Sequence, residues 1–120
     1  SAVAIKANSQ PVELFPLSDV RLGDCYFRHI QELDHEYLLS LETERLLSWF
    51  RKEAGLEQKD IPYPYWESED VWGGGPLAGH IAGFYMSSMS MMYESTGDGR
   101  IKAKLEELLI KKLAFTYLTL

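Results

Sequence analysis

The sequence predicts an all-α protein, because apolar residues recur at helical spacing in four successive segments behind an extended arm. The four segments cover residues 24–41, 44–54, 76–96 and 99–113. A chain of 120 residues is long enough for one compact domain with a modest core. Its hydrophobic fraction of 46% and charged fraction of 25% are typical of globular proteins, so we expect a folded chain.

Residues 1–16 are the predicted arm, since they show no helical period and are interrupted by Pro11 and Pro16. One short strand is expected at residues 12–15. Residues 17–120 are expected to form one helical unit. The chain begins at Ser1 without an initiator Met, which is compatible with a processed protein, and we expect it to be periplasmic or secreted.

The first two helices are predicted from their apolar faces and end signals. Asp24 is expected to cap the first helix, and Thr43 the second. Gly55 is the expected end of the second helix, because glycine readily takes the left-handed conformation. The first helix is predicted to have one apolar face, which contains Phe27, Ile30, Leu33, Tyr37, Leu38 and Leu41.

The third helix is expected to begin at Pro76, because proline suits a first helical position, and to end before Gly97. Residues 77–93 contain no Asp, Glu, Lys or Arg, and such a run approaches the length of a membrane span. Three serines, two glycines and His80 favour instead a helix buried on most sides by other helices. The four methionines of this stretch are expected to lie in the core.

The fourth helix is expected from Gly99 to beyond Leu113, and the tail after it reads differently. Residues 114–120 alternate and are rich in β-formers, which is typical of a strand. A frameshift or early stop would explain this clash with the helix before it. Reading the gene past its stop codon in the other frames tests that hypothesis.

Charge and cysteine content exclude several classes of function. The formal net charge is −6 and no stripe of Lys or Arg is present, so nucleic acid and anionic membranes are poor partners. Cys25 is the only cysteine, which rules out an internal disulfide and a zinc cluster made of cysteines within one chain. A lone cysteine is usually a small apolar filler.

The most informative stretch lies between the second and third predicted helices. Aromatic rings stack on sugar faces and carboxylates accept hydrogen bonds from hydroxyl groups, so its tryptophans and acids suggest a sugar site. The alternative is a packed surface segment with tryptophan anchors. The acids are too close in sequence to infer an acid/base pair across a glycosidic bond. The residues concerned are Trp66, Glu67, Glu69, Asp70 and Trp72.

Two further patterns are weaker. Residues 73–76 read Gly-Gly-Gly-Pro before a helix, as at some anion sites, but lack the lysine and serine or threonine of a phosphate loop. His29, Glu32 and His35 lie three apart on the first helix, and this spacing drifts around the helix too far for a good metal site. His80 stands out on the uncharged third helix.

Several segments resemble the bacterial β-L-arabinofuranosidase-type glycoside hydrolases. They are residues 16–24, 34–39, 45–51 and, most specifically, 66–80, which read WESEDVWGGGPLAGH. The resemblance covers residues 16–108. It implies that the chain is part of an (α/α)6 barrel, with about four helices present here and β-domains further on.

The resemblance also implies a retaining mechanism, with a cysteine nucleophile near a zinc ion held by cysteines and a glutamate. Those residues lie further along the family's chain, and Cys25 matches none of them, so no catalytic or metal-binding residue is assigned here. We expect no cofactor in this segment, although the full-length family carries zinc. The expected wall of the substrate pocket consists of Trp66, Glu67, Asp70, Trp72 and His80.

Three functions follow from these patterns. The first is an N-terminal fragment of a glycosidase that acts on plant-type arabinose-containing glycans and is inactive alone. The second is a non-catalytic helical module that binds sugar or protein, and the third is a small metal-dependent enzyme. A few helices of a closed barrel leave apolar faces uncovered, so we also expect a homo-oligomer, through residues that include Phe115, Tyr117 and Leu118.

Overall fold

The structure is a computed structural model that describes residues 12–64, 67 and 77–118. Within these residues every regular element is a helix, so the predicted all-α class is confirmed and the strand expected at residues 12–15 is wrong. The elements in chain order are a short 3-10 helix η1 (Leu17–Asp19), α1 (Tyr26–Ser40), α2 (Thr43–Leu46), α3 (Ser48–Glu53), α4 (His80–Thr96) and α5 (Gly99–Leu118).

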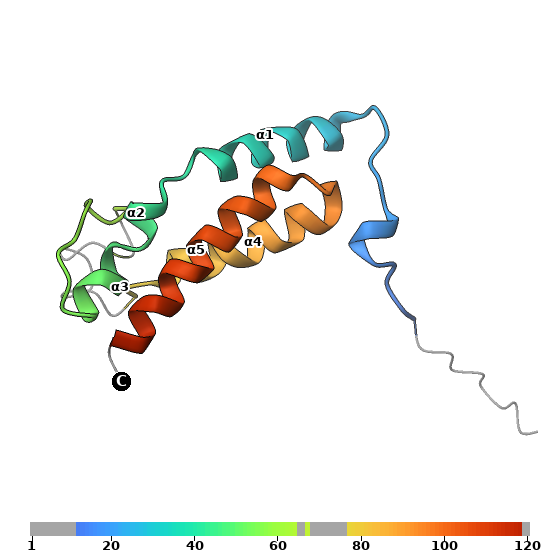
Figure 1. Ribbon diagram of the computed structural model, residues 1–120. Coiled ribbons are helices and arrows are strands. Elements are labelled where there is room, and N and C mark those ends of the chain that lie inside the picture. The colour runs from blue at the N-terminus through green and yellow to red at the C-terminus, as the bar shows by residue number, and fades with distance from the viewer. Residues whose placement is uncertain (1–11, 65–66, 68–76, 119–120) are drawn as a thin grey trace, which may run out of the picture.

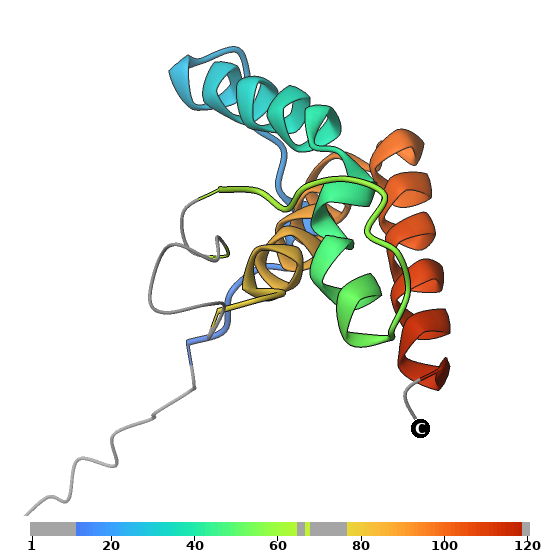
Figure 2. The same cartoon turned by 90° about the vertical axis from the view of Figure 1, so that its left-hand side faces the viewer.

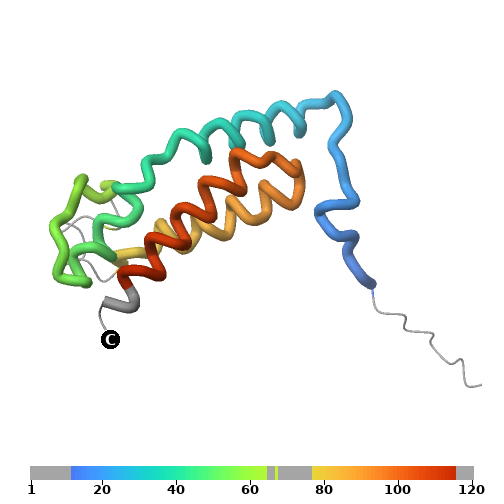
Figure 3. The backbone as a smooth tube through the Cα atoms, viewed as in Figure 1, coloured from blue at the N-terminus to red at the C-terminus, as the bar shows by residue number. Residues whose placement is uncertain are grey.

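Helices α4 and α5 form an antiparallel hairpin, and α1 lies along it (Figure 1). The short helices α2 and α3 lie at the end of the hairpin where α4 begins, and α3 packs against α5. The view at right angles shows α1 and the α4–α5 pair as separate layers (Figure 2). The helix η1, which precedes α1 in the chain, contacts α4. The smooth trace shows the same path from the residues that precede α1 to α5 (Figure 3). This is the arrangement of helical hairpins expected for a segment of a helical barrel.

The core lies between these helices. Helix α4 contributes the largest share of it, four of the ten buried residues, and these lie on one side of the helix, while Phe84 and Met91 are exposed. The helix is therefore not covered on most sides, and not all of its methionines are core residues. The buried apolar cluster consists of Leu38, Leu46, Leu47, Ala82, Tyr85, Met89, Met92, Ile101, Leu108 and Phe115.

At its C-terminal end helix α1 docks through polar contacts as well as through the buried Leu38. The hydroxyl of Tyr85 donates to the carbonyl oxygen of Leu38 at 2.7 Å, and the ammonium of Lys104 donates to that of Leu39. These carbonyls lack partners within the helix, so both contacts satisfy groups that the helix end leaves open. Four members of the predicted apolar face are exposed, in line with the expectation that a few barrel helices leave apolar faces uncovered: Phe27, Ile30, Leu33 and Tyr37.

The ends of the first two predicted helices differ from expectation in their caps. Cys25 occupies the N-cap of α1 without a side-chain hydrogen bond, so Asp24 does not cap it, and Cys25 is exposed where an apolar filler was expected. The second predicted helix is divided into α2 and α3 at Leu47, and Thr43 lies inside α2. The end at Gly55 is confirmed: its φ is +70° and Leu56 N–H donates to the Arg51 carbonyl at 2.9 Å.

The third predicted helix begins later than expected. Helix α4 starts at His80, because Gly79 has a left-handed backbone with φ +83° that a helix cannot contain. Pro76 lies outside the described residues. The predicted stop is confirmed, since Gly97 has φ +70° and its N–H donates to the Tyr93 carbonyl at 2.7 Å. No helix in the described part of the chain is long and apolar enough to cross a membrane.

The strand expected in the tail is wrong as far as Leu118, where α5 ends. Phe115 is only 8% exposed and packs into the core, so burial overrides the β-propensity of its neighbours. Phe115 is therefore not available as part of an exposed interface. The side chains of Tyr117 and Leu118 lie outside the described ones, and the homo-oligomer stays a prediction.

Candidate functional site

Two of the five predicted site residues fall within the described part of the chain. Glu67 and His80 meet at the start of α4, so residues that are distant in sequence come together there. Trp66, Asp70 and Trp72 lie outside the described residues, and their place in the site stays a prediction.

Glu67 is buried, with 1% of its surface exposed. Its Oε1 accepts a hydrogen bond of 2.8 Å from the backbone N–H of Ile81, the second residue of α4. The backbone of Gly79 also donates to this carboxylate. The first N–H groups of a helix have no partner inside it, so Glu67 caps α4 from outside the helix.

The backbone at Gly79 and His80 explains why a carboxylate fits there. Gly79 is left-handed and His80 is already helical, and this succession turns neighbouring N–H groups toward one point, where they bind an anion. Glycine suits the position, because a Cβ on Gly79 would lie 2.9 Å from Cζ of Phe50 as well as straining the backbone. Gly79 and His80 thus form an anion-binding helix start with Glu67 as the anion, whereas residues 73–76, where the sequence resembles such a start, lie outside the described residues.

Burial raises the pKa of the Glu67 carboxyl above its usual range. The hydrogen bonds from Ile81 and Gly79 and the nearby His80 act in the opposite direction, because they favour the ionised form. Desolvation outweighs them, and in the described part of the chain no cationic side chain forms an ion pair with Glu67. This carboxylate is therefore held by backbone N–H groups rather than by an ion pair.

His80 is exposed at the first position of α4, and its Nδ1 lies 3.1 Å from the carbonyl oxygen of Leu77. It borders a depression of about 450 Å³ where α3, α4 and α5 meet, which we call the His80 hollow. Small binding pockets typically have volumes of about 300–1,000 Å³. The lining residues are Phe50, Ala78, Gly79, His80, Gly83, Phe84, Ser87 and Lys112.

The His80 hollow offers chemistry that suits a sugar. Phe84 is 63% exposed and presents an aromatic ring, which can stack on the apolar face of a sugar. The imidazole of His80, the hydroxyl of Ser87 and the ammonium of Lys112 are polar groups that can bind hydroxyls. Sequence reasoning missed Phe84 and Ser87, although their spacing of four and seven from His80 places all three on one face of a helix.

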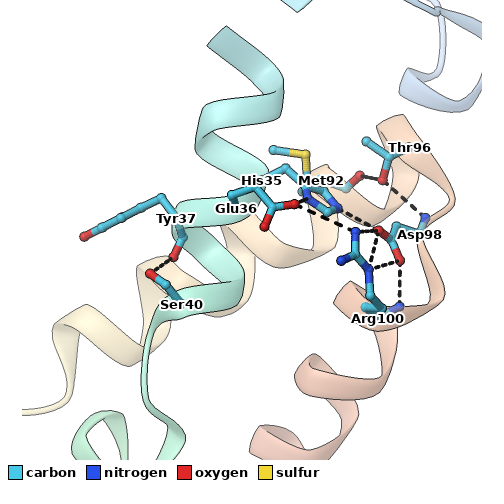
Figure 4. A network of polar contacts seen from close by, with 8 residues as sticks. All are labelled: His35, Glu36, Tyr37, Ser40, Met92, Thr96, Asp98 and Arg100. Atoms are coloured by element: carbon cyan, nitrogen blue, oxygen red, sulfur yellow. Dashed lines mark hydrogen bonds and ion pairs between the residues drawn. The ribbon is translucent and has the colours of Figure 1, made fainter. Parts of the chain in front are cut away.

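A second polar cluster joins α1 to the turn between α4 and α5 (Figure 4). Nε2 of the buried His35 lies 2.9 Å from Oδ2 of Asp98, and Nη2 of Arg100 lies 2.8 Å from the same oxygen. Asp98 Oδ1 also accepts a hydrogen bond of 2.8 Å from Arg100 N–H, the second residue of α5. The hydrogen bonds from Arg100 lower the pKa of Asp98 to about 2. The cluster stabilises the docking of α1.

The described residues contain no group of three or more His, Cys, Asp or Glu side chains that could hold a metal ion. His35 is engaged with Asp98, and Glu32 pairs with Arg28 at 3.0 Å, so these helix residues do not converge. The zinc that the resemblance implies for the full-length family therefore does not fit the residues described here.

Comparison with known proteins assigns the chain to a family. The chain belongs to the class of glycoside hydrolase catalytic domains, since a family model described as beta-L-arabinofuranosidase, GH127 catalytic domain, matches residues 19–114. The chain belongs to this beta-L-arabinofuranosidase family, GH127. The predicted resemblance is confirmed, and the match reaches beyond residue 108, where it was expected to end. A search of curated proteins finds no match.

Proposed function

We propose that this chain supplies part of the arabinose-binding wall of a GH127 catalytic domain and does not hydrolyse glycosides by itself. The His80 hollow is the observation that carries the proposal, because it combines an exposed aromatic ring with three polar side chains on neighbouring helices. Family membership supports arabinose-containing glycans as the ligand. His80 and Phe84 are the two residues we assign to direct contact with the sugar.

The cysteine content supports the absence of hydrolysis. The family resemblance implies a cysteine nucleophile beside a cysteine-bound zinc ion, whereas these 120 residues contain Cys25 alone. Cys25 is exposed at the N-cap of α1, and α1 begins at the opposite end of the molecule from the start of α4 (Figure 1). It therefore has no place beside a sugar in the His80 hollow.

The test combines an activity assay with a titration. We expect no release of arabinose from an aryl β-L-arabinofuranoside, with zinc and a thiol reductant present. In an NMR titration with L-arabinose, we expect shifts at the amides of His80, Gly83, Phe84 and Ser87. His80→Ala is expected to weaken binding about tenfold, because it removes a hydrogen bond to the sugar.

His29→Ala is the matched control, since His29 is also an exposed histidine on a helix and lies on α1. It should leave the affinity unchanged. Enzymatic release of arabinose by the purified chain would contradict the proposed lack of activity. Equal losses of affinity in the His29 and His80 variants would show that the His80 hollow is not the binding site.

A stand-alone sugar-binding module is the second candidate, and the accessible hollow favours it. The same titration separates it from a barrel segment that needs further helices to bind. Saturable binding of L-arabinose by this chain alone supports the module. Binding that appears only when the rest of a GH127 catalytic domain is added supports the segment.

A further inference from the structure

We propose that Glu67 is a positioning residue, whose buried carboxylate fixes the first turn of α4 and so holds His80 at the edge of the His80 hollow. Its Oε1 accepts from Ile81 N–H at 2.8 Å, directly after His80 in the chain. Gly79, directly before His80, donates to the same carboxylate. The backbone of His80 is thus fixed on both sides by one side chain. Only the last step, contact between His80 and a sugar, rests on the proposed function.

The orientation of the His80 ring depends on the same turn. Nδ1 of His80 lies 3.1 Å from the carbonyl oxygen of Leu77, and Leu77 to Gly79 form the turn that leads into α4. The carbonyl of Leu77 also accepts from His80 N–H at 3.1 Å. A change at Gly79 would therefore move both the start of the helix and the acceptor that orients the ring.

The burial of Glu67 argues for positioning over direct contact with a sugar. A residue with 1% of its surface exposed offers almost no area to a hydroxyl group, and its Oε1 already accepts from a backbone N–H. His80, by contrast, is exposed beside the hollow. The two predicted site residues thus have different tasks: one would contact the ligand, and the other holds the first in place.

NMR without any sugar tests the positioning directly. In the unaltered chain we expect a scalar coupling through the hydrogen bond, between the amide nitrogen of Ile81 and the carboxyl carbon of Glu67. In Glu67→Ala, the Ile81 amide proton should move upfield and the ring signals of His80 should shift. Glu67→Gln should restore both, because its amide oxygen can accept the same bond. Glu94→Ala, an exposed acid on α4, is the control that should change neither.

A titration with L-arabinose then tests the consequence for binding. Glu67→Ala should weaken binding by about three- to tenfold, as expected for a lost hydrogen bond. The same change made in the His80→Ala variant should cost nothing more, because Glu67 acts through His80. A general structural defect would weaken both backgrounds equally.

Several results would overturn the positioning role. They are the absence of the coupling in the unaltered chain, unchanged His80 ring signals in Glu67→Ala, and additive losses in the double variant. If Glu67→Ala does not fold, the coupling in the unaltered chain and the ring signals of Glu67→Gln still test whether Glu67 positions His80. If arabinose binds neither to the unaltered chain nor to this chain together with the rest of a GH127 catalytic domain, the proposed function fails, whereas the ring signals still report on Glu67 and His80.

Discussion

The starts of α4 and α5 are each capped by a carboxylate, but the two carboxylates lie in opposite environments. Each helix has its second backbone N–H bound at 2.8 Å, by Glu67 in α4 and by Asp98 in α5. Glu67 is buried and its pKa is raised by desolvation, whereas Arg100 holds the pKa of Asp98 at about 2. A helix cap therefore does not by itself set the pKa of the capping acid. Burial and the presence of a cation decide the direction.

The two caps also differ in how they connect the chain. Asp98 directly precedes α5, so its cap is local, although its contact with His35 extends it to α1. Glu67 is separated from α4 by residues 68–79 and brings a remote part of the sequence to the helix start. A local cap mainly stabilises its own helix, whereas the remote cap also ties Glu67 to the start of α4.

Removing the remote cap should have the largest effect on stability. Glu67→Ala is expected to lower the free energy of unfolding by about 2–3 kcal/mol, because it leaves buried N–H groups without an acceptor. Urea denaturation followed by circular dichroism measures this loss. The exposed Glu94→Ala should stay within about 0.5 kcal/mol of the unaltered chain. A loss of the same size in both variants would show that the burial of Glu67 has no energetic role.

Two glycines with a left-handed backbone allow a second comparison of the two helix starts, and changing them should cost less stability than removing Glu67. Gly79 precedes α4 and Gly97 precedes Asp98, with φ of +83° and +70°. Gly97→Ala should cost about 1 kcal/mol from backbone strain alone, since nothing lies within 4 Å of its added Cβ. Gly79→Ala should cost about 1 kcal/mol more, because its Cβ would meet the ring of Phe50 at 2.9 Å.

Thermal or urea unfolding of the two alanine variants compares them directly. Equal losses would mean that the Phe50 ring moves away from Gly79 without cost. A larger loss at Gly97 would contradict the role given to Phe50.

The contrast between local and remote contacts also explains which parts of the molecule could be predicted from the sequence. Gly55 and Gly97 were found as helix ends because their effect is local, and each terminates the helix directly before it. The converging N–H groups at Gly79 were missed, since their role depends on a carboxylate that is remote in sequence. Glu67 and His80 were predicted as site residues, but the link between them through the start of α4 was not visible in their spacing.

Burial was the other quantity that periodicity could not supply. The spacing of Phe27, Ile30 and Leu33 correctly places them on one helix, but they are exposed because no described element covers them. Phe115 shows the converse, since its local sequence favours a strand while packing against the core keeps it helical. A pattern predicts which residues share a face, whereas the neighbouring elements determine whether that face is buried.

The pH dependence of stability should show the smallest effects, with opposite signs for the two caps. Asp98 has a folded pKa of about 2, below its unfolded value of 3.8, so its contribution is present above pH 3.8 and is lost as the pH falls toward 2. The pKa of Glu67 is raised above its unfolded value of 4.5, so its contribution is full below that pH and declines as the pH rises through the folded pKa.

Unfolding free energies measured between pH 2 and pH 7 for Asp98→Asn and Glu67→Gln separate these two contributions. Both amides keep a capping oxygen and remove the titration, so each variant is compared with the unaltered chain at every pH. Asp98→Asn should lessen the fall in the free energy of unfolding below pH 3.8, the acid limb of the curve. Glu67→Gln should remove the fall in the free energy of unfolding above pH 4.5. A flattened acid limb in Glu67→Gln would mean that its pKa is lowered, and the proposed contrast between a buried cap and an ion-paired cap would then be wrong.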